Sequence, residues 1–119
     1  MFDELRPVTG EKFTKYCGWA ATLIDSLDTL HIMGLQKEWE EAVAALAGVD
    51  FNHPYETCGV NVFETTIRHL GGLLAAFDLD GGKNEILRRK LEEAGEMLFA
   101  EFGTANRLPC GGFTWPLYG

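Results

Sequence analysis

The sequence is poor in positive charge. Its 119 residues include ten Lys and Arg against eighteen Asp and Glu, which gives a formal net charge of −8. Nucleic acids and anionic membrane surfaces are bound by clustered Lys and Arg. The only adjacent basic pair, Arg88 and Arg89, lies among glutamates. This charge distribution argues against nucleic acid or an anionic membrane as a partner.

Long apolar runs are also missing. No stretch of 18 apolar residues occurs, so we expect no membrane-spanning helix, and membrane association would need an anchor outside this sequence. The first residues have neither the basic nor the apolar region of a signal peptide. Apolar residues nevertheless make up 46% of the chain, which is enough for one small domain with a packed core.

Cysteine is scarce as well, with only Cys17, Cys58 and Cys110. These residues form no CxxC pair and no Cys/His spacing suited to zinc. Because their number is odd, at least one thiol would stay free even in an oxidising compartment. We expect all three to behave as compact apolar thiols without a chemical role.

Apolar residues recur at helical spacing in four segments, which predicts an all-α fold of two antiparallel helical hairpins. The predicted helices cover residues 11–34, 36–47, 62–78 and 84–102. Residues 49–61 have a loop composition with room for a short extended piece, and residues 103–119 form a loose tail without periodicity. The third helix is expected to have an apolar stripe made of Phe63, Ile67, Leu70, Leu74 and Phe77.

A polar strip interrupts the first predicted helix. At about 100° per residue, one sector contains Thr22, Asp25, Ser26 and Thr29, with Asp28 beside it. The surrounding residues are too apolar for a helix with half of its surface in water, which favours a polar interior or cavity. An exposed polar seam is the alternative, because a buried acid is costly unless paired and no basic residue stands four positions from Asp28.

The third predicted helix combines an acid–base pair with two glycines. Glu64 and Arg68 are four residues apart, within pairing distance on one helical face. Gly71 and Gly72 come next, although each costs about 1 kcal/mol relative to Ala inside a helix. We therefore expect another element or a ligand to approach closely there. A carboxylate beside such a recess fits glycoside hydrolysis, which needs a proton donor and a second carboxylate that activates water.

Three ordered blocks of sequence point to a known family. The first combines DELRPV at residues 3–8 with GWAATLIDSLDTL at 18–30 and IMGL at 32–35; the second is VNVFETTIR at 60–68, and the third is LGGLLAAF at 70–77. These blocks resemble the opening of glycoside hydrolase family 47, the class I α-1,2-mannosidases. The resemblance implies an (αα)7 barrel, of which residues 1–119 would be a partial catalytic domain containing about the first two of seven hairpins.

The same resemblance implies a function and a site. The expected activity is calcium-dependent, inverting removal of α-1,2-linked mannose from high-mannose N-glycans, in the endoplasmic reticulum or Golgi. By motif position, Glu64 would be the proton donor and Asp28 a second active-site acid, with Arg68 and Glu4 close to the pocket. In the family, the expected base and the calcium-binding threonine belong to later hairpins. We therefore expect no metal site in this chain and no activity from it alone.

Two alternatives stay open at the level of sequence. Mannosidase-like relatives that bind misfolded glycoproteins and direct them to degradation share these blocks. A non-catalytic four-helix domain would carry Glu64 and Asp28 on exposed faces. The residues after Pro109 depart from the family pattern, from which we expect a truncated or altered reading frame.

Overall fold

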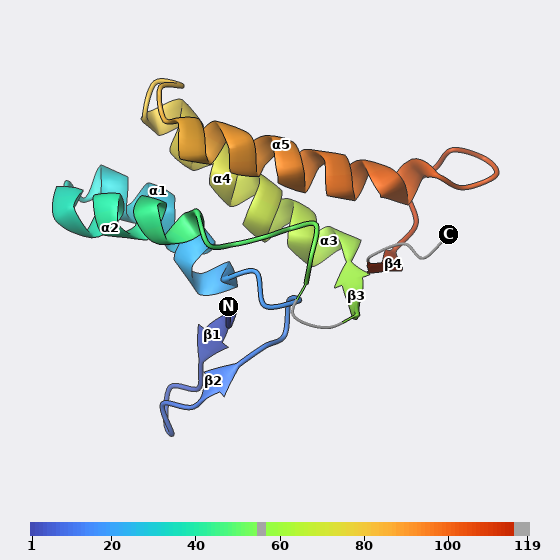
Figure 1. Ribbon diagram of the computed structural model, residues 1–119, viewed down its shortest axis with the longest axis horizontal. Helices are drawn as coiled ribbons and strands as arrows, with labels where there is room; N and C mark the ends of the chain where they lie inside the picture. Colours follow the sequence, from blue (N-terminus) through green and yellow to red (C-terminus); the bar gives the residue numbers. More distant parts are fainter. Residues whose placement is uncertain (55–56, 116–119) are drawn as a thin grey trace.

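The computed structural model describes residues 1–54 and 57–115, so residues 55–56 of the predicted loop and 116–119 of the predicted tail lie outside the description. The body consists of two helical hairpins (Figure 1). The first contains α1 (Ala21–Ile32) and α2 (Gln36–Leu46). The second begins with a continuous helix, α3 (Val62–Thr65), the π turn η1 (Thr66–Leu70) and α4 (Gly71–Leu79), and returns through α5 (Glu85–Phe99) and the 3-10 turn η2 (Ala100–Phe102).

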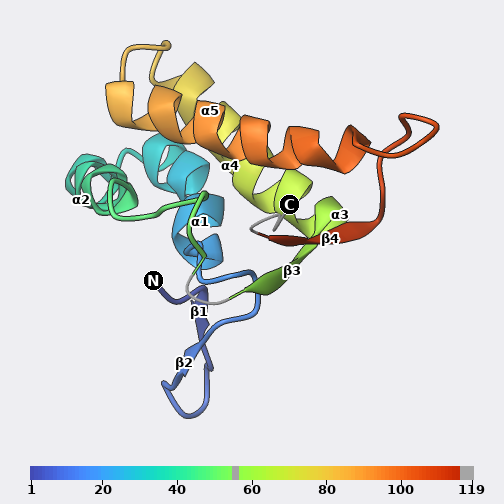
Figure 2. The ribbon, with the colours of Figure 1, turned by 45° about the vertical axis from the view of Figure 1, so that its right-hand side comes forward.

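The two hairpins pack against each other, with α1 on α4 and α2 on α5 (Figures 1 and 2). Their shared core contains Trp19, Ile24, Leu27, Leu46, Leu73 and Leu87. Within the described residues, no helix is both long and apolar enough to cross a membrane.

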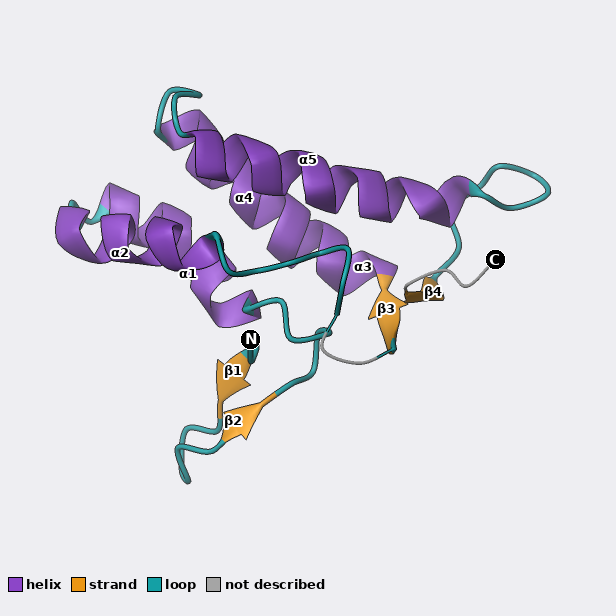
Figure 3. Cartoon of the chain, viewed as in Figure 1, coloured by secondary structure: helices purple, strands orange, loops and turns teal. Residues whose placement is uncertain are grey.

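Two small antiparallel sheets flank the helices (Figure 3). In one, β1 (Glu4–Leu5) pairs with β2 (Lys12–Phe13); in the other, β3 (Cys58–Asn61) pairs with β4 (Gly112–Trp115), placing Val60 opposite Phe113. The chain is thus mostly helical but not all-α, and the predicted loose tail contains a strand. β3 and β4 are far apart in the sequence, so local periodicity carries no trace of their pairing.

The helix predicted from residue 11 begins instead at Ala21, and the preceding loop wraps around Asp3. This carboxylate is 1% exposed and accepts hydrogen bonds from four backbone N–H groups between Lys15 and Ala21, at 2.6 to 3.4 Å. The Asp3 carbonyl accepts a fifth, from Thr22 N–H at 2.9 Å. Ala20, the residue before α1, provides no side-chain cap. Asp3 therefore caps α1 from a distant part of the chain, and the helix starts ten residues later than periodicity predicts.

A disulfide joins the same loop to β3, between Cys17 and Cys58. The expectation of three free thiols is therefore wrong for these two residues, and among the described residues only Cys110 is free. Cys17 has a φ of 61°, so the loop turns sharply where it meets β3. Because the two cysteines are 41 residues apart, the cross-link should stabilise the fold by about 4 kcal/mol through loop closure.

The expected close approach at the glycine pair is confirmed for Gly72. A Cβ there would lie 3.0 Å from Ile24 Cγ2 and 3.1 Å from the Ile24 carbonyl oxygen, so the approaching element is α1. A Cβ on Gly71 would meet only the Thr66 carbonyl oxygen, at 3.4 Å. The missing side chain of Gly72 lets the two hairpins cross closely and does not create a recess.

The third predicted helix is confirmed in its bounds, but its predicted apolar stripe is not its buried face. The buried residues are Thr65, His69, Leu73 and Ala76. Three members of the predicted stripe are instead exposed to solvent: Phe63 (68%), Ile67 (50%) and Leu74 (47%). We refer to these three as the exposed apolar stripe. Contact with α1 selects the face that carries the small Gly72, and this turns the larger apolar residues outward.

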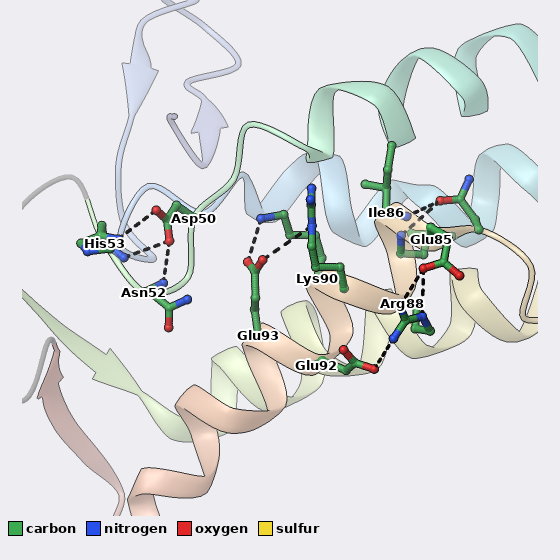
Figure 4. Close-up of polar contacts among 12 residues, drawn as sticks. Asp50, Asn52, His53, Glu85, Ile86, Arg88, Lys90, Glu92 and Glu93 are labelled. Carbon is green, nitrogen blue, oxygen red and sulfur yellow. Dashed lines mark hydrogen bonds and ion pairs between the residues drawn. The ribbon is translucent and has the colours of Figure 1, made fainter.

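Polar contacts lie along α5 and, separately, within the loop of Asp50, Asn52 and His53 that follows α2 (Figure 4). Arg88 bridges Glu85 and Glu92, at 2.7 Å from each carboxylate, and its side chain is 48% exposed. Lys90, by contrast, is buried and donates to Glu93 at 2.7 Å. The predicted helix of residues 84–102 is confirmed, with Asn84 as its cap and a solvated outer face.

Candidate active site

Arg68 joins two carboxylates that belong to different hairpins. Its Nε donates to Glu64 Oε2 at 2.7 Å, and its Nη1 donates to Asp25 Oδ2 at 3.0 Å. Glu64 lies on α3 and Asp25 on α1, so this ion-pair group spans the contact between the hairpins. The hydrogen bonds to Asp25 and then to Glu64 raise the pKa of Arg68, which keeps the guanidinium charged.

The junction of β3 and α3 fixes the backbone of Glu64. Asn61 is the last residue of β3 and has extended backbone angles, and its Oδ1 accepts a hydrogen bond from Glu64 N–H at 2.9 Å. An Asn at this position satisfies an otherwise unpaired N–H group in the first helical turn. The Glu64 side chain is 28% exposed, so it reaches solvent from a backbone position that this hydrogen bond fixes.

The Tyr16 ring covers this group from the side of the Asp3 loop. Arg68 Cζ lies 5.5 Å from the ring centroid, and Lys15 Nζ lies 5.1 Å from it. The interaction with Tyr16, and after it the charges of Glu4 and Glu64, raise the pKa of Lys15. The Lys15 ammonium therefore lies in the field of both glutamates.

A pocket of about 250 Å³ opens beside the Glu64 carboxylate. Its walls come from the Asp3 loop, β3 and the start of α3, and are formed by Lys15, Tyr16, Cys17, Gly59, Asn61, Glu64 and Thr65. The sequence predicts a carboxylate beside a recess, and Glu64 does line one. The recess is nevertheless built by the loop and β3 and not by the glycine pair on α4.

The other predicted site residues stand outside this pocket. Asp28 is half-buried, and its Oδ1 accepts hydrogen bonds from Thr29 N–H at 2.6 Å and Thr29 Oγ1 at 3.3 Å. It lies about 4.5 Å further along α1 than Asp25 and about 60° around the helix. Glu4, half-buried on β1, reaches the site only through the field at Lys15. The structure thus brings Glu64 and Arg68 together. Asp28 lies about one helical turn from Asp25, the α1 carboxylate that Arg68 binds.

The polar strip of α1 is largely exposed in this chain. Thr22, Asp25 and Thr29 are exposed, whereas Ser26 and Asp28 are half-buried. In this chain the strip is therefore an exposed polar seam and does not face a polar interior or cavity. Asp25 within it is bonded to Arg68.

His69, which directly follows Arg68, is a buried residue that no sequence pattern singles out. It is 0% exposed, and its ring lies edge-on to Tyr16, Trp19 and Phe51 at centroid distances of 6.4, 6.0 and 5.9 Å. Neither ring nitrogen has a hydrogen-bond partner among the described residues. Burial lowers the pKa of His69 to about 4, so the imidazole is neutral near pH 7.

Metal binding finds no support in the described residues. No group of three or more His, Cys, Asp or Glu side chains in residues 1–54 and 57–115 is arranged to hold a metal ion. This part of the chain therefore offers no fit for the calcium ion that the resemblance implies. Positive charge beside Glu64 comes from Arg68 and Lys15 instead.

Comparison with known proteins places this geometry in a family. The sequence profile of glycosyl hydrolase family 47 matches residues 1–117, which include all the site residues described above. The chain belongs to glycosyl hydrolase family 47. The endoplasmic reticulum mannosyl-oligosaccharide 1,2-alpha-mannosidase of Homo sapiens is 43% identical to this family 47 chain over 107 residues. The mannosyl-oligosaccharide 1,2-alpha-mannosidase IA of Sus scrofa is 40% identical to it over 111 residues.

These matches cover 90% of the family 47 chain but only 15% and 16% of the two mannosidases, so the chain spans a small part of its relatives' length. The solved structure of an alpha-1,2-mannosidase from Trichoderma reesei matches with a TM-score of 0.82 and 29% identity, over 93% of this chain and 25% of that one. The two hairpins and their flanking strands thus resemble part of a mannosidase fold. The family and the names of these relatives are those of glycosidases.

Proposed function

We propose that this chain forms part of the active site of a mannosyl-oligosaccharide 1,2-α-mannosidase that trims high-mannose N-glycans. The observation that carries the proposal is the Glu64 carboxylate, which lines a pocket and is held by Arg68 within a family 47 chain. The activity for which the Homo sapiens and Sus scrofa relatives are named supports mannosyl-oligosaccharide as the substrate class.

In this proposal Glu64 supplies the proton that the glycosidic oxygen takes up as its bond to the sugar breaks. The proton passes directly or through a water molecule. A second carboxylate, from outside the described residues, activates water on the opposite face of the sugar, which gives inversion. Asp28, which stands outside the pocket of this chain, acts as a further acid in the larger cavity that the complete barrel would enclose. Arg68 and Glu4 lie at the edge of that cavity and orient the substrate and the carboxylates.

The proposal places these residues in an (αα)7 barrel whose other hairpins complete the site. The exposed apolar stripe of Phe63, Ile67 and Leu74 supports this, because large apolar side chains exposed along one helix offer apolar surface that another element can cover. The proposed enzyme depends on calcium, whose ligands come from outside the described residues. Without the base and these ligands, the 119 residues alone have no means to hold the reacting groups together, so we expect them to be inactive.

The proposed location is the secretory pathway. The Cys17–Cys58 disulfide supports it, because disulfides persist in oxidising compartments and are rare in the cytosol. The Homo sapiens relative is named as an endoplasmic reticulum enzyme, which agrees with such a compartment. Cell fractionation after thiol blocking tests this point, since a reduced pair in a cytosolic fraction would contradict it.

A chimera tests the catalytic proposal. Residues 1–108 of this chain replace the matching segment of the Homo sapiens enzyme, and release of mannose from a high-mannose oligosaccharide is measured with calcium and with a chelator. We expect turnover that gives the β-anomer first and is lost with the chelator. Glu64→Gln should lower kcat by about 10²- to 10⁴-fold, the usual contribution of a general acid. Glu85→Gln, which removes an exposed carboxylate of α5, should leave kcat unchanged.

Each failure of this experiment has a distinct meaning. An unchanged kcat in the Glu64→Gln chimera would show that Glu64 is not the proton donor. Mannose release by the 119 residues alone would contradict the proposed incomplete site. A folded chimera that retains the oligosaccharide without cleaving it would favour the glycoprotein-binding relatives over the enzymes.

A further inference from the structure

The Cys17–Cys58 disulfide joins the two segments that flank the Glu64 carboxylate. On one side, Cys17 adjoins Tyr16, whose ring covers the Arg68 guanidinium. On the other side, Cys58 begins β3, which ends at the residue that caps α3 at Glu64. The disulfide therefore connects the loop that carries the Tyr16 ring with the strand that leads to Glu64.

Tyr16 is held from both directions along the chain. Its N–H donates to the Asp3 carboxylate at 2.6 Å, and the next residue, Cys17, has a φ of 61° and is cross-linked. The ring also packs edge-on to the buried His69. The backbone of Tyr16 is therefore fixed by the loop and its ring packs on a buried side chain, so the ring can act as a support for the Arg68 side chain, which is 37% exposed.

We propose that Tyr16 is a positioning residue for Glu64: its ring holds the Arg68 guanidinium against the Glu64 carboxylate, and the Cys17–Cys58 disulfide keeps the ring in place. This inference deepens the proposed function, because the positioned carboxylate is the proposed proton donor. A dithiol reductant should release the support. It closes to a cyclic disulfide as it transfers two electrons, while Cys17 and Cys58 each take up a proton and become thiols.

Arg88 provides an internal control within the same chain. Like Arg68 it binds two carboxylates, although both belong to its own helix: Nε donates to Glu85 at 3.1 Å and Nη1 to Glu92 at 2.7 Å. These contacts lie on the open outer face of α5 (Figure 4). No cation–π contact is found for Arg88 among the described residues, whereas Arg68 has one with Tyr16. A change that acts through the Tyr16 ring must therefore affect Arg68 and leave Arg88 as it was.

The experiment follows the exchange of arginine Nε–H protons with water by NMR in the ¹⁵N-labelled 119-residue chain, with Arg68→Lys and Arg88→Lys used to assign the two signals. In the oxidised chain we expect slower exchange at Arg68 than at Arg88. Tyr16→Ala should accelerate exchange at Arg68 by about tenfold, within the range of a cation–π contact. Tyr16→Phe keeps the ring and should restore the original rate. Reduction with dithiothreitol should accelerate exchange at Arg68 without changing Arg88.

Two results would overturn the inference. The first is an unchanged Arg68 rate in a folded Tyr16→Ala chain, and the second is a Tyr16→Phe rate as fast as that of Tyr16→Ala. If Tyr16→Ala accelerates both arginines, the chain has lost its fold, and Tyr16→Leu with the reduced wild-type chain then decides by the same criteria. None of these measurements depends on mannose release, so their failure is distinguishable from failure of the proposed function.

Discussion

Acidification should destabilise the fold through His69. The folded chain holds this imidazole at a pKa of about 4, against 6.5 for an ordinary histidine. Burial is the main cause, and Arg68 acts in the same direction, whereas the charges of Asp3 and Asp25 oppose it. The unfolded chain therefore binds a proton at a higher pH than the folded chain does. Stability is complete above pH 6.5 and is lost as the pH falls from there to about 4.

The size of this loss comes from the two pKa values. The interval between 6.5 and about 4 corresponds to about 3 kcal/mol in the free energy of unfolding, of which about 2 kcal/mol is already lost at pH 5. A small domain has a total stability of about 5 to 15 kcal/mol. A single buried imidazole should thus account for a large fraction of the acid sensitivity.

Urea denaturation followed by tryptophan fluorescence at several pH values between 7 and 4 measures this loss. His69→Phe keeps an aromatic ring in the cage and removes the titration, so its stability should fall by about 3 kcal/mol less than that of the wild type over this range. Equal pH dependence in the His69→Phe chain and the wild type would refute the reasoning.

Three further predictions concern the supports of the fold. Gly72→Ala should destabilise the fold by about 1 to 3 kcal/mol, because its Cβ would press on the Ile24 backbone. Gly71→Ala should be neutral or stabilise the fold by up to about 1 kcal/mol. Chemical denaturation of both variants measures these effects, and equal effects would contradict the close crossing of the hairpins at Gly72. Asp3→Ala should cost about 3 kcal/mol or more and Asp3→Asn less, since the backbone N–H groups lose their acceptor; a wild-type melting curve for Asp3→Ala would exclude remote capping. Replacing Cys17 and Cys58 by Ser should cost about 4 kcal/mol, and peptide mapping without reductant checks the linkage first.

Much of the helical framework is readable from the sequence because local periodicity determines it. In α2, Trp39, Val43 and Leu46 recur at spacings of four and three, and all three are buried. Asn84 and the apolar residues after it define α5 in the same local way. The Glu64–Arg68 pair is also predictable from spacing alone, since both residues lie on one short helical stretch.

The remaining features depend on contacts between distant residues. Asp3 sets the start of the first helix from outside it, and Asp25 meets Arg68 across 43 positions of sequence. Tyr16 reads as one more apolar residue of a helix, although it lies in a loop against Arg68. Which two of the three cysteines form the disulfide cannot be predicted from the sequence, because the Cys17–Cys58 pair depends on the contact between the loop before α1 and β3. The positive φ values of Cys17 and Ala20 have no signal in the sequence, because both residues normally avoid them.

The π turn at Thr66–Leu70 separates the pocket from the core within one continuous helix. A turn of this kind contains one residue more than an α-helical turn, so it rotates the residues after it by about 100° relative to the residues before it. Glu64 stands before this turn and Gly72 after it. A single inserted position thus sets the angle between the Glu64 side chain and the packing face at Gly72. Deleting one residue of the turn would rotate the Glu64 carboxylate by about 100° relative to that face.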